Sequence, residues 1–248
     1  MQKFKFTFFL AIILFNLLSC ERKTKLLIAT DPNWPPMEFT NENNQLVGFD
    51  IDLMREIAKK GKFIVEFTNV SWENIFLGLE SNLYDAVIAD VGITEERKKI
   101  MDFSFPYLND GQVLVIRKEL NNITNLNQMI GKKVGAQENT IGAYEIQKVK
   151  DVIFIPYKNI SDAFSDLYSK NIDGLVCGLS TAANQIMKYS NYNSYLMITG
   201  KPFTFEPSGI AIKKGNNYVK NLINNSLKQV LYEKINEKLE NKWLRQNF

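Results

Sequence analysis

Short runs of β-strand character alternate with helix-like segments throughout residues 25–248. We expect strands at residues 25–29, 45–49, 63–67, 84–89, 111–117, 132–137, 152–156, 171–178, 195–198 and 209–213. We expect helices at residues 51–60, 72–81, 141–148, 160–169, 181–189 and 216–243. Asp50 is expected to cap the first of these helices and Gly61 to end it. An alternation of this kind predicts an α/β protein with sheets flanked by helices.

The N-terminus has the pattern of an export signal. Two lysines among the first five residues precede an apolar run at residues 8–18. That run is shorter than the ~20 residues that a membrane-spanning helix needs, and its length and flanks are typical of a secretory signal peptide. It ends in Leu-Leu-Ser-Cys, which resembles the bacterial lipobox. The resemblance implies a signal peptide at residues 1–19, a lipid (palmitate) anchor on Cys20 and a tether at residues 20–24.

The composition narrows the classes of partner. The 248 residues contain no histidine, and 30 Lys and Arg residues are interspersed with 27 Asp and Glu residues. We therefore expect no nucleic-acid partner, no metal site and no cofactor. Cys177 is the one thiol besides Cys20, so we expect no internal disulfide and a buried structural cysteine.

A series of short motifs carries a family resemblance. They are TDPNWPPMEF at residues 30–39, LVGFDIDL at 46–53, YDA at 84–86, ITEERKK at 93–99, DFSFPY at 102–107, GKKVG at 131–135, IDG at 172–174 and EPSGIAIKKG at 206–215. In this order and spacing they resemble the periplasmic amino-acid-binding proteins of ABC importers, which form solute-binding protein family 3. The motifs span most of the chain after the signal.

The resemblance implies a two-lobe clamshell of the periplasmic-binding-protein type II. The first lobe would contain residues 25–112 and 204–248, and the second lobe residues 113–203. Two crossing segments, near residues 111–116 and 198–203, would form the hinge. Ligands of open α/β sheets bind at the carboxyl ends of the strands, and closure of two lobes around a ligand is a known hinge motion.

The same resemblance implies a function in transport. We expect an exported, membrane-anchored, monomeric lipoprotein that captures a small amino-acid-like ligand with a carboxylate and delivers it to an ABC importer permease. The alternative on the same fold is an enzyme that resembles cyclohexadienyl dehydratases, for which Asp90, Glu138 and Glu206 are conceivable acids. A surface lipoprotein acting as an adhesin is a third possibility. Because no paired catalytic motif accompanies these acids, we expect a binding protein and no catalytic residues.

Arg97 is the first candidate for holding a ligand. A guanidinium presents a planar fork that pairs with both oxygens of a carboxylate. In the proteins that this chain resembles, the arginine of the Ile-Thr-x-Glu-Arg motif holds the ligand α-carboxylate, and Gly92 and Thr94 precede it here. The alternative is a surface arginine within the cluster formed with Lys98 and Lys99.

Further candidates come from the same resemblance. Trp34 and Trp72 match positions where the family places aromatic rings against the ligand, and Asp31 matches an acid near the site. The alternative for each tryptophan is an ordinary core residue. Thr140 and Ile141 precede a helix whose backbone donors would meet a carboxylate, although the glycine usual before the threonine is missing here.

Three departures from the family pattern concern the ligand ammonium. The family usually ends the strand after Ile172-Asp173 with an aspartate that accepts the α-ammonium, and here that position is Gly178. Asp90 replaces a small residue, and Gly92 replaces a residue that is often Ser or Thr. Asp90 would then supply the missing acid from the other lobe, or the ligand lacks an α-ammonium, or Asp90 merely caps a turn. A buried carboxylate needs a cation or solvent in each case.

Overall fold

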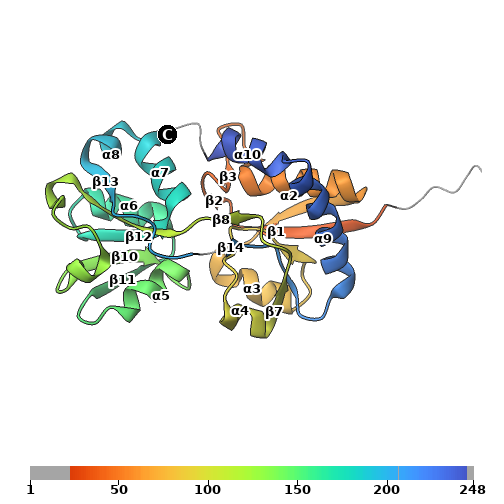
Figure 1. The fold of residues 1–248 in the computed structure, drawn as a ribbon, viewed down its shortest axis with the longest axis horizontal. Coiled ribbons are helices and arrows are strands. Elements are labelled where there is room, and N and C mark those ends of the chain that lie inside the picture. Colours follow the sequence, from red (N-terminus) through yellow and green to blue (C-terminus); the bar gives the residue numbers. More distant parts are fainter. Residues whose placement is uncertain (1–22, 206, 245–248) are drawn as a thin grey trace, which may run out of the picture.

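The computed structural model describes residues 23–205 and 207–244. Two five-stranded sheets lie side by side, each covered by helices, and the chain crosses between them near β8 and β14 (Figure 1). The first sheet has the order β5 (Ile64–Asn69), β1 (Lys25–Thr30), β6 (Ala86–Val87), β15 (Ala211–Lys213) and β7 (Met101–Phe103). The second has the order β11 (Ile153–Tyr157), β10 (Lys133–Gln137), β12 (Gly174–Gly178), β9 (Gln112–Arg117) and β13 (Leu196–Thr199).

The inner strands of each sheet are largely buried on both faces, which explains their apolar runs, whereas the edge strands β5 and β11 are partly exposed. In the first sheet, one face packs against α2 (Phe49–Gly61) and α9 (Asn217–Tyr232), and the other packs against α3 (Trp72–Glu80). In the second sheet, one face packs against α6 (Ile160–Tyr168) and α7 (Leu179–Lys188), and the other against α5 (Ile141–Lys148). The remaining helices are α4 (Glu95–Ile100), α8 (Ser190–Tyr195), α10 (Ile235–Trp243) and the short 3₁₀ helices Lys118–Leu120 and Leu126–Met129.

Two small sheets lie beside the large ones. β8 (Leu108–Asn109) pairs with β14 (Pro207–Ser208), so the two chain crossings between the large sheets run next to each other. A three-stranded sheet is formed by β2 (Asn33–Trp34), β3 (Glu38–Thr40) and β4 (Leu46–Val47). Together they bring the loop after β1 and the crossing segments to the region between the large sheets.

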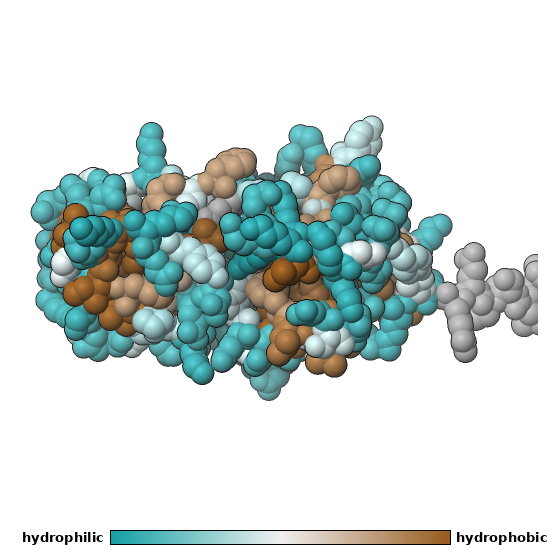
Figure 2. Space-filling model, turned by 90° about the horizontal axis from the view of Figure 1, so that it is seen from below, coloured by the Kyte–Doolittle hydropathy of each residue, from teal (hydrophilic) through white to brown (hydrophobic). Residues whose placement is uncertain are grey.

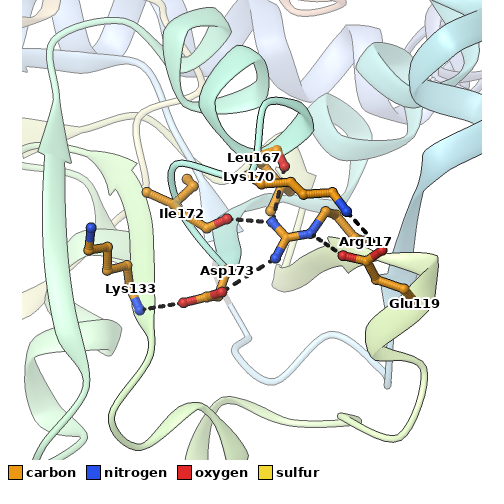
Figure 3. Close-up of polar contacts among 7 residues, drawn as sticks. All are labelled: Arg117, Glu119, Lys133, Leu167, Lys170, Ile172 and Asp173. Atoms are coloured by element: carbon orange, nitrogen blue, oxygen red, sulfur yellow. Dashed lines mark hydrogen bonds and ion pairs between the residues drawn. The ribbon is translucent and has the colours of Figure 1, made fainter.

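In both large sheets an aspartate side chain joins two neighbouring strands, and these aspartates belong to the YDA and IDG motifs. The Asp85 carboxylate, just before β6, accepts a hydrogen bond of 2.8 Å from the Leu27 backbone N–H. The Asp173 carboxylate, just before β12, accepts one of 3.0 Å from the Lys133 N–H (Figure 3). In both sheets an aspartate therefore fastens the start of one strand to the neighbouring parallel strand.

A buried arginine strengthens this connection in the second sheet. Arg117 is 5% exposed, and its guanidinium donates to the carbonyls of Leu167 and Ile172 and to the Asp173 carboxylate (Figure 3). Glu119 accepts from the same guanidinium at 3.0 Å. The turn between α6 and β12 is thus held by one side chain from β9.

One of the two predicted boundaries of α2 is wrong. The cap of α2 is Gly48, whose φ of 135° and close approach to the Met37 carbonyl leave no room for a Cβ. Asp50 instead lies inside the first turn and is fully buried. At the other end, α2 ends at Gly61 as predicted, and the left-handed residue that caps it is Lys62, with φ 55°. A side chain at position 61 would collide with Ser226 and Phe63.

Four further features bear on the predictions from the sequence: Cys177, the length of the helices, the surface and the residues outside the described part of the chain. Cys177 is a free, buried cysteine, as expected. Within residues 23–205 and 207–244, no helix is long and apolar enough to span a membrane. The face shown in Figure 2 is mainly hydrophilic, with separate hydrophobic patches in each half. The predicted signal peptide, Cys20 and Glu206 lie outside the described residues.

Candidate functional site

A cavity lies where the two large sheets face each other. The empty space among its residues, including the part open to solvent, is about 550 Å³. The residues that line it come from both halves of the molecule: Asp31, Trp34, Glu38, Trp72, Ala89, Asp90, Gly92, Arg97, Asp110, Gln112, Gln137, Thr140, Ile141, Gly178 and Ser208. Among the described residues, no group of His, Cys, Asp or Glu side chains is arranged to hold a metal ion.

The structure brings most of the predicted site residues together. The cavity is lined by Asp31, Trp34, Trp72, Asp90, Gly92, Arg97, Thr140, Ile141 and Gly178. Thr94 is not among the lining residues. Its hydroxyl accepts a hydrogen bond of 3.1 Å from the Arg97 N–H and caps α4, so it fixes the backbone that carries Arg97.

Arg97 joins the two sides of the cavity. Its guanidinium donates to the Gly92 carbonyl at 2.9 Å on its own side and to the Asn139 carbonyl at 3.2 Å on the other. It also lies 5.3 Å from the ring centroids of Trp72 and Phe76, within the range of cation–π attraction. The aromatic rings and the carbonyls together fix the direction in which the guanidinium presents its N–H groups.

The two tryptophans and Asp31 form one wall. The Asp31 carboxylate is 7% exposed and accepts a hydrogen bond of 2.9 Å from the Trp72 N–H, which places it at the start of α3. Trp34 packs against the cores of both large sheets. Each tryptophan thus packs against a core and also lines the cavity. The two interpretations of the sequence, a core residue and an aromatic wall of the site, are compatible.

Thr140 and Ile141 approach from the second sheet. The Thr140 hydroxyl accepts from the Ala143 N–H at 3.3 Å and donates to the Gln137 carbonyl at 2.6 Å, so it caps α5. A Cβ at Gly92 would collide with the end of the Ile141 side chain. Gly92 therefore allows the two halves to approach closely at this point.

A buried polar network holds Asp90 in place. Asp90 has a φ of 45°, in the left-handed region that non-glycine residues seldom adopt. Its backbone N–H donates to the Asp50 carboxylate at 2.7 Å, which also accepts from the Tyr107 hydroxyl at 2.9 Å. The Ser208 hydroxyl donates to the Asp90 carboxylate at 2.5 Å. The carboxylate is therefore anchored to the crossing segment as well as to its own loop.

Burial raises the pKa values of the acids in this network. Burial raises the pKa of Asp50 to about 7, against the lowering effect of the Asp90 N–H and the Tyr107 hydroxyl. Burial, with the nearby charges of Asp50, Asp90 and Asp31, also raises the pKa of Glu38 well above its ordinary value. Glu38 Oε2 and Asp50 Oδ1 accept no hydrogen bond from a fixed donor in the described residues, which fits a proton shared between these two carboxyls.

Asp110 is one of the cavity acids that the sequence analysis did not identify. Asp110, between β8 and β9, is 7% exposed and lies beside Gly178. Its carboxylate accepts from the backbone N–H and the hydroxyl of Ser180, at 3.1 Å and 3.0 Å. Burial raises its pKa to about 6. The other residues missed are Glu38, Ala89, Gln112, Gln137 and Ser208.

The comparisons with known proteins agree with this architecture. The family model for bacterial extracellular solute-binding proteins, family 3, matches residues 26–246. The chain belongs to this family. The named relatives are solute-binding proteins and not enzymes, in agreement with the prediction from the sequence.

Individual relatives in this solute-binding family are similar over nearly the whole chain. The putative ABC transporter arginine-binding protein 2 of Escherichia coli (strain K12) is 29% identical over 229 residues, which are 91% of this chain and 93% of that protein. The ABC transporter glutamine-binding protein GlnH of Bacillus subtilis (strain 168) is 32% identical over 212 residues, which are 83% of this chain and 75% of that protein.

A solved structure supports the fold. An ancestral arginine-binding protein bound to arginine is 38% identical, with a TM-score of 0.84, and the match covers 89% of this chain and 98% of that chain. The predicted α/β fold with two lobes, of the solute-binding type, is thereby confirmed. Named relatives in this family are amino-acid-binding parts of ABC transporters.

Proposed function

We propose that this chain captures a small amino acid, or a related carboxylate, outside the cytoplasm and delivers it to the permease of an ABC importer. The observation that carries the proposal is the cavity between the two halves. Arg97 lines this cavity and donates hydrogen bonds to Gly92 on one side and to Asn139 on the other. The named relatives act in amino-acid transport, and their names include arginine and glutamine as ligands.

The proposal assigns roles to the lining residues. Arg97 pairs with the ligand carboxylate, and the backbone around Gly92, Thr94, Thr140 and Ile141 encloses it. Trp34 and Trp72 contact the ligand side chain, with Asp31 behind Trp72. Asp90 accepts the ligand ammonium in place of the acid that is missing at Gly178.

The proposal also divides the chain into moving parts. Residues 25–112 and 204–248 form the first lobe, residues 113–203 form the second, and the segments at 111–116 and 198–203 form the hinge. The pairing of β8 with β14 supports this division because it holds the two crossing segments together beside the hinge.

A ligand screen tests the function. Thermal unfolding of the purified protein is measured with each of the twenty amino acids, with polyamines and with dicarboxylates, since a specific ligand raises the melting temperature by mass action. We expect at least one amino acid to stabilise the protein and the Arg97→Ala variant to lose that stabilisation. No stabilisation by any amino acid, or full stabilisation of the variant, would contradict the proposal.

The anchor is tested separately. We propose that Cys20 carries the lipid and that the protein is a monomer on the membrane surface. Cells that express the chain are labelled with palmitate, and we expect the label on the wild type and on Cys177→Ser but not on Cys20→Ser. Label retained by Cys20→Ser would place the lipid elsewhere.

A further inference from the structure

Asp110 occupies the space above Gly178. A Cβ built on Gly178 would lie 2.6 Å from Asp110 Oδ2, closer than such atoms approach in proteins, and 4.0 Å from Asp90 Oδ2. No side chain fits at position 178 while Asp110 keeps this place. A carboxylate that position 178 lacks is therefore supplied by Asp110 from a different segment of the chain.

The two carboxylates face the same point from different parts of the structure. Asp90 follows β6 and is held by Ser208 and, through its backbone, by Asp50. Asp110 lies on the crossing segment before β9 and is held by the start of α7 through Ser180. Both side chains line the cavity, and a Cβ built on Gly178 lies within 4.0 Å of an oxygen of each.

The charge of the cavity favours a cation at this point. The ionisable residues that line it are four acids, Asp31, Glu38, Asp90 and Asp110, and one base, Arg97. Asp50 and Tyr107 add an acid and a phenol behind Asp90, and the Cys177 thiol lies near Asp110. Asp110 is buried and Asp90 is partly buried, and two carboxylates that both lie within 4.0 Å of a Cβ built on Gly178 repel each other unless a cation or a proton lies between them.

We propose that Asp110 and Asp90 together bind a cationic nitrogen of the ligand, above Gly178. The proposal rests on the proposed function, because it takes Arg97 as the partner of the ligand carboxylate, and it goes beyond that function by adding Asp110. The nitrogen is the α-ammonium or a cationic group in the ligand side chain. Asp110 lies beside the hinge and Asp90 lies in the first lobe. A nitrogen bound to both carboxylates would therefore connect the hinge segment with the first lobe.

The first test distinguishes the binding of a ligand cation by Asp110 from the capping of α7 by the same side chain. An Asp110→Asn variant keeps a side-chain oxygen for the Ser180 N–H, since asparagine is as good a cap as aspartate, but it removes the charge. Asp166→Asn is the matched control. The Asp166 carboxylate also accepts hydrogen bonds, from Tyr157 and Asn171, but it does not line the cavity. Calorimetry measures the affinity of each variant for L-arginine.

We expect Asp110→Asn to weaken L-arginine binding roughly tenfold or more, as the loss of one partner of a buried charge pair does, and Asp166→Asn to stay within roughly twofold. Equal affinity of Asp110→Asn and the wild type would overturn the proposal. Loss of binding in both variants would also count against it, because the effect would then not be specific to Asp110.

Three analogues identify the nitrogen. L-Citrulline lacks the cationic side chain, 5-guanidinopentanoate lacks the α-ammonium, and agmatine lacks the carboxylate. If Asp110 and Asp90 hold the α-ammonium, Asp110→Asn weakens L-citrulline but not 5-guanidinopentanoate. If they hold the side-chain cation, the pattern is reversed. Wild-type binding of agmatine as tight as that of L-arginine would contradict the carboxylate role of Arg97 and so the proposed function.

A relocation experiment tests the geometry. Gly178→Asp alone brings a side chain into the Asp110 carboxylate and should abolish tight binding, whereas Asp110→Ser frees the space. We expect the double variant Asp110→Ser with Gly178→Asp to bind L-arginine more tightly than either single variant, because the acid returns to nearly the same point. A double variant no better than the weaker single variant would overturn the proposal. If the wild-type protein binds other amino acids but neither L-arginine nor L-citrulline, Asp110→Asn and Asp166→Asn are compared with the tightest of those amino acids, and equal affinity of Asp110→Asn and the wild type then overturns the proposal while the proposed function stands.

Discussion

The Arg97 guanidinium donates a hydrogen bond of 3.2 Å to the Asn139 carbonyl, and the two residues lie on opposite sides of the cavity. A second contact across the same gap is the ion pair of Lys158 with Glu73, at 3.5 Å. The second pair is exposed and contributes little, whereas Arg97 is fixed by two aromatic rings and the Gly92 carbonyl. Arg97 therefore contacts both lobes at the point where we propose that the ligand carboxylate binds.

Replacement of Arg97 by lysine should weaken ligand binding at least roughly tenfold, because an ammonium cannot present two parallel N–H groups to a carboxylate. The measurement is calorimetric titration with the tightest amino acid of the screen. Lys98→Arg is the control, since Lys98 pairs with the exposed Glu95 in the same helix turn. Unchanged affinity of Arg97→Lys would remove Arg97 from the carboxylate site.

Replacement of Asp90 by glycine should lower the ligand affinity with little effect on folding. The left-handed backbone at φ 45° suits glycine, and this gain roughly offsets the greater freedom of glycine in the unfolded chain. We expect a melting temperature of the ligand-free protein within ~2 °C of the wild type.

The control for this change is Asn82→Gly. Asn82 has a φ of 58° in an exposed turn after α3, so the same exchange is made where no ligand contact is proposed. Both variants should melt alike, and only Asp90→Gly should bind the ligand more weakly. Equal affinities of the two variants would leave Asp90 with a turn-forming role alone.

The stability of the ligand-free protein should fall as the pH rises from ~4 to ~7. Burial raises the pKa of Asp50 from its ordinary 3.8 to about 7 and that of Asp110 to about 6. In this window the folded protein holds more protons than the unfolded chain, so raising the pH favours unfolding. Denaturant titrations at several pH values measure the slope.

Two variants make this pH test specific. Asp110→Asn should flatten the lower part of the slope, because its carboxyl no longer titrates. Asp166→Asn should leave the slope unchanged, since the pKa of Asp166 is lowered by its hydrogen bonds with Asn171 and Tyr157 and its effect falls below this window. Stability that rises between pH 4 and pH 7 would contradict the burial of these acids.

Replacement of Asp85 by alanine should destabilise the protein by about 1–3 kcal/mol, because the Leu27 N–H would lose its partner within the sheet. Glu66→Ala is the control, since Glu66 forms an exposed ion pair with Lys25 whose loss is expected to cost about 0–1 kcal/mol. Chemical denaturation measures both. A loss for Asp85→Ala no larger than that for Glu66→Ala would show that the fastening of β1 to β6 is dispensable.

Much of the fold could be predicted from the sequence because the buried parallel strands are continuous apolar runs. The first and second sheets contain strands near every predicted apolar run from Lys25 onward except the one at residues 45–49, which belongs to the small sheet. The short strands β7, β8 and β14 carry no periodic signal, because they are only two or three residues long.

The candidate site was predictable where a residue stands in a motif and not where its role depends on a contact distant in sequence. Arg97 and Trp72 were named from local patterns and line the cavity. Asp110 has no such pattern, and its importance depends on Gly178, which lies 68 positions later in the sequence. Asp50 was assigned a helix cap because aspartate is common there, but Gly48 takes that place and Asp50 is buried beneath Asp90.

The position of β15 has a consequence for the order in which the chain folds. β15 lies between β6 and β7, although it is made more than a hundred residues after both. The second sheet is formed by a continuous stretch and can be completed as soon as β13 has been synthesised. The first sheet must wait, with the facing edges of β6 and β7 unpaired and open to association with other chains. A polypeptide that stops before Ala211 is thus a half-folded molecule with a finished second lobe, and a natural target for chaperones and proteases.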